Sequence, residues 1–152
     1  MPDRVIKRVL APVELSESEL PDMQYAVHVA QQLGAELILF AVIDTPAMVQ
    51  MIGQHKAVEG RSESFNASLV ADAKTILQPY VDQAAAIGVE ALGHATVGED
   101  VVAGILKEAL VQKVDMILVR ATERHGIMQA LMGDMAGEIL KAAPCPVLVA
   151  RS

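Results

Sequence analysis

Short apolar runs alternate along this chain with longer segments in which apolar residues recur at helical spacing. Five runs are expected to form strands: Val5–Val13, Leu37–Ile43, Val89–Val97, Asp115–Val119 and Val147–Ala150. Runs that are hydrophobic at consecutive positions are typical of strands buried on both faces of a parallel sheet. The third run is more polar and contains His94, so we expect it nearer an edge of the sheet.

The segments between the runs predict helices, because their apolar residues repeat every three to four positions. The first helix is expected to begin at a Ser16 or Ser18 cap, with Pro21 in its first turn, and to end at Gly34. A longer helix is expected from Ser62 or Ser64 to Gly88.

Two further helices complete the pattern. Asp100 is predicted to cap the third, after the turn Gly98–Asp100. Its buried stripe is expected to contain Val102, Ile105, Leu106 and Ala109. The fourth helix is expected over Asp134–Ala142. In the long helix that precedes both of these, Pro79 is expected to cause a bend.

Strands that alternate with helices predict an α/β fold with a doubly wound parallel sheet, covered on both faces by right-handed crossovers. The 152 residues are expected to form a single domain, residues 1–152. Two segments lack a regular period: a long connection over Asp44–Arg61 and a loop over Arg120–Met132. Long loops in compact domains are often functional.

The unit Val114–Ala150 is the favoured place for a small ligand. It reads as strand, loop, helix and strand. In such units ligands bind outside the carboxyl end of the first strand, at the amino end of the helix that follows. The loop Arg120–Met132 therefore holds the main information about what this protein binds.

Charge and composition exclude several classes of function. The net charge is −7 and no run of five basic residues occurs, so neither nucleic acid nor an anionic membrane surface is an expected partner. The longest apolar run, Leu37–Ile43, is far too short to cross a bilayer. The first ten residues lack the apolar block of a signal peptide, and one cysteine, Cys145, allows no internal disulfide. A cytoplasmic setting is expected.

Metal and redox chemistry are also disfavoured. The four histidines, His28, His55, His94 and His125, lie on separate predicted elements with no paired ligand spacing. Cys145 stands between two prolines before an apolar strand, where a small buried hydrophobic residue is expected. Glu14 and Asp134 would pair two carboxylates at the carboxyl end of the sheet, where acid–base chemistry or binding of a divalent cation is conceivable. A solvated pair is the favoured interpretation.

Several stretches resemble the universal stress proteins. Val9–Glu17 resembles their opening strand and turn, and Val114–Val119 resembles their fourth strand. Ala143–Val149, with its Pro-Cys-Pro step, is very close to their last strand. The resemblance implies a Rossmann-like, adenine nucleotide alpha hydrolase-like sheet in the order 3-2-1-4-5. It also implies a homodimer formed through the fifth strand, here Val147–Ala150, an apolar edge of the kind that tends to pair.

The family's nucleotide-binding members carry a signature of Gly, two residues, Gly, nine residues, Gly and then Ser or Thr. Its glycines let backbone N–H groups approach phosphate closely. In this chain the corresponding residues are Arg120, Glu123, Gly133 and Asp134, so only the third glycine is kept. Asp134 would occupy the anion position at the helix start with its own carboxylate. Glu14 and Leu15 replace the family's Asp and Gly after the first strand.

These departures predict a non-catalytic homodimer that acts through contacts with unidentified protein partners and has no resident cofactor. The alternative is a sensor that binds ATP or AMP between strands one and four. It is motivated by Gly126 and Gly133, and by the two arginines of the loop. A nucleotide in that cleft would be bordered by Pro12, Val13, Glu14, Val42, Val119, Arg120, Arg124, Gly126, Gly133 and Asp134.

An enzyme on the same sheet is the third hypothesis. A phospho-acceptor receiver needs an acidic pair after the first strand, an Asp after the third strand and a Lys late in the sheet. Only Glu14 matches, because Val97 and Gly98 end the third strand and Arg151 follows the fifth. No Gly-Lys-Ser/Thr phosphate loop is present either. The sequence therefore favours a protein without catalytic activity.

Overall fold

A computed structural model of the chain describes residues 5–13, 15, 20–44, 62–121 and 136–151. Residues 136–142 form a helix between the last two strands. The other elements, in chain order, are β1 (Arg8–Val13), α1 (Leu20–Leu33), β2 (Glu36–Asp44), α3 (Ser62–Ala86), β3 (Ala91–Gly98), α4 (Val101–Val111), β4 (Met116–Ala121) and β5 (Val147–Arg151).

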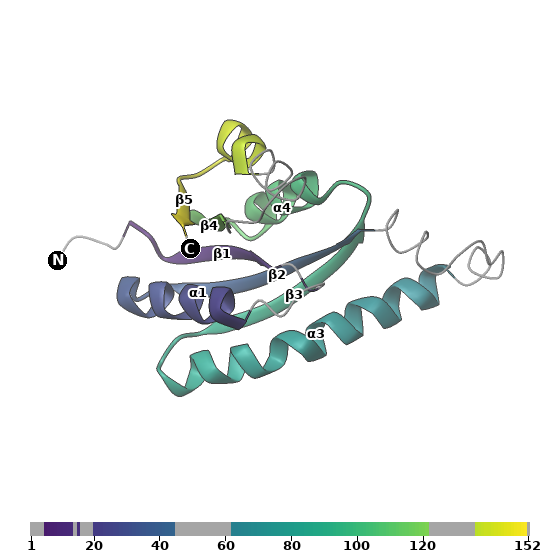
Figure 1. Cartoon of the computed structure of the whole chain (residues 1–152), viewed down its shortest axis with the longest axis horizontal. Coiled ribbons are helices and arrows are strands. Elements are labelled where there is room, and N and C mark those ends of the chain that lie inside the picture. The colour runs from purple at the N-terminus through teal and green to yellow at the C-terminus, as the bar shows by residue number, and fades with distance from the viewer. Residues whose placement is uncertain (1–4, 14, 16–19, 45–61, 122–135, 152) are drawn as a thin grey trace.

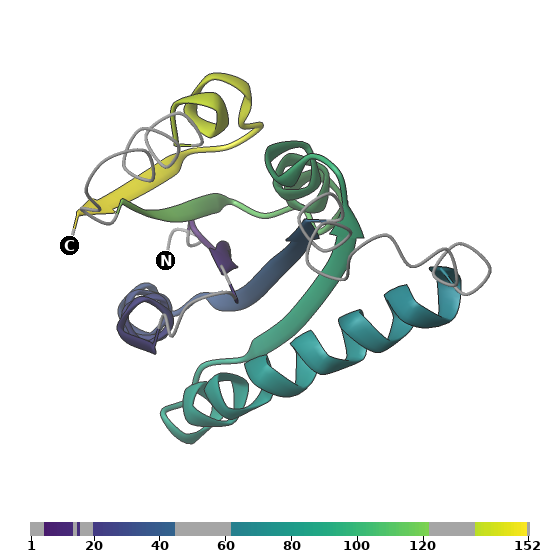
Figure 2. The same ribbon diagram turned by 45° about the vertical axis from the view of Figure 1, so that its right-hand side comes forward.

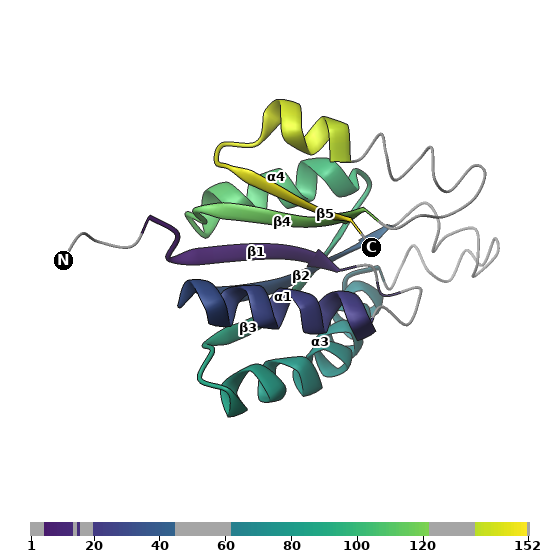
Figure 3. The same ribbon diagram turned by 60° about the vertical axis from the view of Figure 1, so that its left-hand side comes forward.

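The five strands form one parallel sheet in the order β3-β2-β1-β4-β5. Helices α1 and α3 cover one face, and α4 and the helix 136–142 cover the other (Figure 1 and Figure 3). The predicted fold class and strand order are therefore confirmed. The polar third strand lies at an edge, as its composition predicted, and β5 lies at the opposite edge.

Each face of the sheet has its own hydrophobic core, because successive strand residues point to opposite sides. On the α1 and α3 side, Val9 and Leu39 pack with Leu77 of α3. On the α4 side, Leu10 and Phe40 pack with Ile105 of α4. The largest fully buried side chains of the described residues are all aliphatic except Phe40. This core matches the aliphatic composition of the chain.

Three helices end in the same hydrogen-bonded cap, in which a residue at positive φ turns the chain back. At the end of α1, Gly34 has φ 65° and the Ala35 N–H donates to the Ala30 carbonyl over 2.9 Å. Gly88, at φ 85°, ends α3 in the same way. Both glycines are the stops that the sequence predicted. The cap of α4 instead uses Lys113, at φ 52°.

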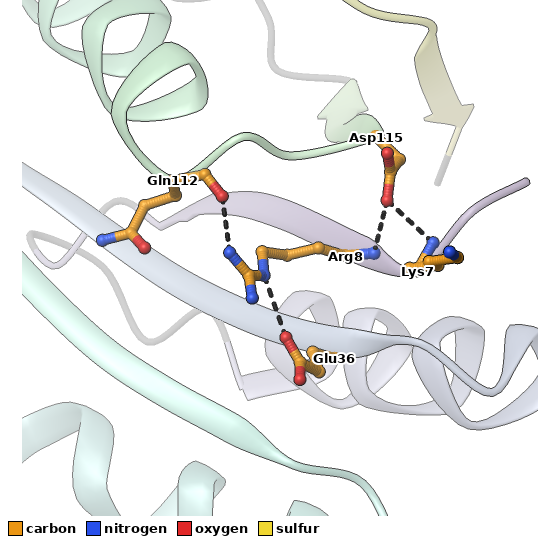
Figure 4. A network of polar contacts seen from close by, with 5 residues as sticks. All are labelled: Lys7, Arg8, Glu36, Gln112 and Asp115. Carbon is orange, nitrogen blue, oxygen red and sulfur yellow. Dashed lines mark hydrogen bonds and ion pairs between the residues drawn. The ribbon is translucent and has the colours of Figure 1, made fainter.

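A polar network ties the amino ends of the strands together (Figure 4). The Asp115 carboxylate accepts the backbone N–H groups of Lys7 and Arg8, over 2.9 and 3.0 Å. The Arg8 guanidinium donates to Glu36 over 2.9 Å and to the Gln112 carbonyl over 2.6 Å. Gln112 is the C-cap of α4, so Arg8 places a cation where the helix dipole favours one.

Two boundary predictions are wrong. The first strand begins at Arg8, and Val5 is 83% exposed. The loop was expected to begin at Arg120, but β4 continues through Arg120 and Ala121 because both pair with β5. Helix α3 contains Pro79 and is continuous from Ser62 to Ala86, so the bend predicted at this proline stays a prediction.

Candidate functional site

The sheet reverses its winding between β1 and β4, and the pairing of these two strands stops before their carboxyl ends. Their register contains only Val9 opposite Met116 and Leu10 opposite Ile117. On either side the pairing continues further: β1 pairs with β2 as far as Val13, and β4 pairs with β5 as far as Ala121. Sheets of this kind bind ligands at such a reversal.

Pro12 gives a chemical reason why the pairing of β1 with β4 ends early. The Arg8 carbonyl accepts the N–H of Asp115 over 2.8 Å, and the Lys7 carbonyl accepts the N–H of Glu36 over 2.9 Å. Even-numbered residues of β1 therefore turn their backbone groups toward β4, and odd-numbered residues turn theirs toward β2. Pro12 faces β4 but has no N–H to donate. The ladder between β1 and β4 stops where that donor is missing.

The predicted site residues that the structure describes divide between the two faces of the sheet. Pro12 lies opposite Phe40 in the register and so shares its face. Val42 and Val119 belong to the same, α4-facing side, where Val119 is buried and Val42 half-buried. Val13 packs instead against the core on the α1 and α3 side. Of the four candidates whose side chains the structure describes, three are thus brought to one face.

The side chain of Leu15 lies on the α1 and α3 side of the sheet, away from Pro12 and Val42. It is half-buried and packs against the hydrophobic residues on the α1 and α3 side. Its position after the first strand, where the family has a glycine, does not place its side chain at the ligand position. A leucine where the family has glycine therefore adds buried apolar surface to the fold.

The remaining candidates lie outside the described residues. These are Glu14, Arg124, Gly126, Gly133 and Asp134. Arg120 is the penultimate residue of β4. The start of the predicted loop therefore lies at the carboxyl end of β4, next to the reversal of the sheet. The predicted Met128, Met132 and Met135 cluster and the Asp44–Arg61 connection beyond Asp44 also fall outside the described residues.

A polar pair on the α4 side was missed by sequence reasoning. His94 Nδ1 of β3 lies 2.5 Å from Glu108 Oε2 of α4, and the Gln112 amide donates to the same oxygen over 3.3 Å. The His94 ring also packs on Phe40, with ring centroids 5.6 Å apart. Glu108 is 7% exposed and is the one buried charged residue of the described chain.

Glu108 could have been found from its spacing. It falls three residues after Ile105 on the buried stripe of α4, where a charged side chain needs a partner. Leu106, which the sequence placed on that stripe, is half-buried. A carboxylate bonded to an imidazole can orient a base, yet no hydroxyl or thiol of a described residue is bonded to this pair. The pair joins β3 to α4.

Cys145 is partly buried against the α4-side core, as its sequence context predicted. Burial raises the pKa of its thiol above the ordinary value of 9.0, and the nearby Asp115 carboxylate raises it further. The backbone N–H of Ile117 acts in the opposite direction. The thiol is therefore held in its protonated, weakly nucleophilic form.

Other site types receive no support from the described residues. Among them, no group of three His, Cys, Asp or Glu side chains could hold a metal ion. No helix in this part of the chain is long and apolar enough to cross a membrane. The reversal between β1 and β4 is the position that best fits a small-molecule site.

Comparison with known proteins places this geometry in one family. The family model described as "Universal stress protein family" matches residues 6–151. The universal stress protein MJ0531 of Methanocaldococcus jannaschii is 27% identical over 150 residues, which cover 98% of this chain and 84% of that protein.

Solved structures share the fold at lower identity. The universal stress protein UspA from Lactobacillus plantarum has a TM-score of 0.73 and 23% identity, covering 96% of this chain and 98% of its own. A universal stress protein solved in complex with cAMP has a TM-score of 0.63 and 19% identity, covering 96% of this chain and 97% of its own.

Proposed function

Because the chain belongs to the universal stress protein family, we propose that it is a non-catalytic stress-response protein whose nucleotide loop has lost its function. The observation that carries this proposal is the residue set at the family's phosphate-binding signature: Arg120, Glu123 and Asp134 replace two glycines and a hydroxyl residue. Phosphate would meet side chains where it needs bare backbone, and a carboxylate where it needs a donor.

The position of Asp134 gives further support to a closed site. Asp134 stands at the start of the last helix in the sequence, and a carboxylate there satisfies the helix dipole without any ligand. An incoming phosphate would have to displace that carboxylate and face its charge.

The protein then acts through protein contacts, first of all as a homodimer. The structure supports this because β5 is an edge strand that exposes two apolar side chains: Leu148 is 39% and Val149 36% exposed. Antiparallel pairing of β5 with its copy would satisfy the open backbone groups and bury these side chains.

A nucleotide sensor is the second candidate. The pairing of β1 and β4 ends before Pro12, at the reversal of the sheet where folds of this kind bind their ligands. A related protein of the same fold was solved in complex with cAMP. Gly126 and Gly133 are kept in the loop, and Arg120 and Arg124 bring two cations to it. In this case the arginines would take over the role of the lost glycines.

Calorimetric titration of the nucleotide-free protein with ATP, with and without Mg²⁺, separates the two. We expect no saturable heat up to millimolar ATP. The matched variant combines Arg120→Gly, Glu123→Gly and Asp134→Ser, and we expect it to gain micromolar binding. Micromolar binding by the natural chain, unchanged or lost in that variant, would establish the sensor and overturn the first proposal.

A further inference from the structure

Helix α4 is largely apolar on its solvent side as well as on its buried side. Ile105 is buried in the core of the sheet. At 3.6 residues per turn, four exposed residues fall within an arc of about 100° opposite Ile105: Ala103, Lys107, Leu110 and Val111. We call these four residues the α4 ridge. Helices that are apolar on every side are normally covered on every side, so the ridge is a candidate contact surface.

The exposure of Leu110 and Val111 sets this ridge apart from the other helices. They are 63% and 64% exposed, and within the described helices and strands the next large apolar side chain is Leu140, at 53%. Figure 2 shows α4 and the helix 136–142 on one side of the sheet and α1 and α3 on the other. The exposed side of α3 includes Ile76 but is largely polar, with Asp72, Thr75, Gln78 and Asp82.

The charges at the carboxyl half of the ridge are positive. Lys107 lies within the ridge and Lys113 follows the helix; both are exposed, and neither forms an ion pair with a described residue. Glu99 and Asp100 stand at the opposite, amino end of α4, where Asp100 caps the helix. Glu108 turns inward and bonds to β3. In a chain with a net charge of −7, this surface therefore presents two unpaired cations beside exposed apolar residues.

These charges decide between two kinds of occupant. Lys107 lies at the middle of the ridge, so in a two-fold contact centred on it Lys107 would face its own copy. Like charges placed opposite each other disfavour that contact. The neighbouring helix 136–142 exposes Glu138 and Lys141, whose charges balance. A different protein that carries carboxylates matches the ridge better than a second copy of this chain does.

We propose that the α4 ridge docks an amphipathic helix of a partner protein, which packs apolar residues on Leu110 and Val111 and presents carboxylates to Lys107 and Lys113. This surface gives the partner contacts of the proposed function a place and a chemistry, and to that extent it rests on that function. Helix α4 packs on β2 and β3, away from the β5 edge, so a dimer formed through β5 leaves the ridge open.

Dilution followed by NMR tests first whether the ridge is free. The amide signals of Leu110 and Val111 should keep the same chemical shifts from micromolar to millimolar protein. A concentration-dependent change confined to α4 would mean that a second copy covers the ridge, and the proposed partner would be wrong.

Binding is then tested with a library of displayed helical peptides that vary along one face. Selection on the natural chain should enrich peptides whose apolar residues lie three and four positions apart and are flanked by Asp or Glu. Leu110→Ser removes an apolar anchor at an exposed position and should weaken the enriched peptides by about tenfold or more. Ile76→Ser, at a residue of α3 that is 50% exposed, is the matched control and should bind them as the natural chain does.

The charge contact has its own pair of variants. Lys107→Glu should weaken the enriched peptides by about fivefold. Lys74→Glu, the same change on the exposed side of α3, should not weaken them. No enrichment, or enriched peptides that bind Leu110→Ser as well as the natural chain, would overturn the docking surface, and enrichment of basic peptides would overturn the acidic partner. The ATP titration judges the nucleotide loop separately, since none of the substituted residues belongs to that loop.

Discussion

At the scale of single residues, the pairing of Glu108 with His94 is the interaction most sensitive to substitution. Loss of His94 would leave a carboxylate that is 7% exposed with only the Gln112 amide as a partner. We expect His94→Leu to lower the free energy of unfolding by about 1–3 kcal/mol, the usual cost of an unsatisfied buried group. Urea denaturation followed by circular dichroism measures this directly.

The double variant distinguishes a paired carboxylate from simple loss of packing. Replacing both partners by apolar residues removes the stranded charge, so His94→Leu with Glu108→Leu should cost less than the two single variants added together. Lys107→Ala, at the exposed neighbouring position, should change stability by less than about 0.5 kcal/mol. Additive losses would show that Glu108 and His94 contribute separately.

Cys145 gives a prediction about pH. Because its pKa is raised in the folded chain, the rate of alkylation by iodoacetamide should reach half its maximum above pH 9.0. Asp115→Asn should move that midpoint downward, since it removes the second cause of the shift while keeping an acceptor for the Lys7 and Arg8 N–H groups. A midpoint below 9.0 in the natural chain would contradict the burial of the thiol.

The sign of the linked stability effect follows from the same shift. The unfolded chain loses the thiol proton first, so the contribution of this group to stability is complete below pH 9.0 and declines as the pH rises through the folded pKa. Cys145→Ala should remove that decline from a series of denaturation curves. Stability declines rather than rises with pH because the burial of the thiol and the charge of Asp115 both raise the pKa of Cys145 in the folded chain.

At the scale of elements, the three helix ends differ in a testable way. Gly34 and Gly88 adopt positive φ without strain, but Lys113 has φ 52° and carries a Cβ. Lys113→Gly should therefore stabilise the protein by about 1 kcal/mol against urea. A loss of stability would show that the lysine side chain contributes more than its backbone strain costs.

Gly88→Ala is the matched change in the opposite direction. Nothing lies within 4 Å of the position that its Cβ would take, so only the backbone conformation at φ 85° opposes the substitution. We expect a loss of about 1 kcal/mol, in line with the strain of a side chain at positive φ. Equal and opposite effects at Gly88 and Lys113 would establish that the caps of α3 and α4 share one conformational cost.

Sequence reasoning succeeded for whole elements better than for their contacts. Consecutive apolar runs placed the strands, and Gly34 and Gly88 placed two helix stops. Asp100 was identified as a cap, and its carboxylate indeed accepts the Ala103 N–H over 3.1 Å. The effect of Pro12 on the pairing of β1 with β4 could not be predicted, because it depends on which neighbouring strand each residue of β1 faces. Glu108 was missed because charged helix residues usually face solvent.

At the scale of the whole molecule, the strand order came from the family resemblance and the helix layers from alternation along the chain; both are confirmed. The site was predictable only as a position. Its loop chemistry depends on residues outside those described, and the faces of Leu15 and Val13 required the register of a folded sheet. Family membership therefore locates the ligand position, and the residues of the phosphate-binding signature decide which ligand it can bind.

The dimer is the last prediction at this scale. Both edges of the sheet expose apolar residues: β5 presents Leu148 and Val149 with 39% and 36% exposure, and β3 presents Leu92 with 50%. The family resemblance favours β5 as the contact. Val149→Lys should place a charge at the centre of the expected β5 contact and convert the protein to a monomer in sedimentation velocity. Leu110→Lys makes the same kind of change at a residue of α4 that is 63% exposed, and it should leave the dimer intact. A natural chain that sediments as a monomer would contradict the homodimer itself. A dimer that survives Val149→Lys but not Leu110→Lys would move the interface from β5 to the α4 surface.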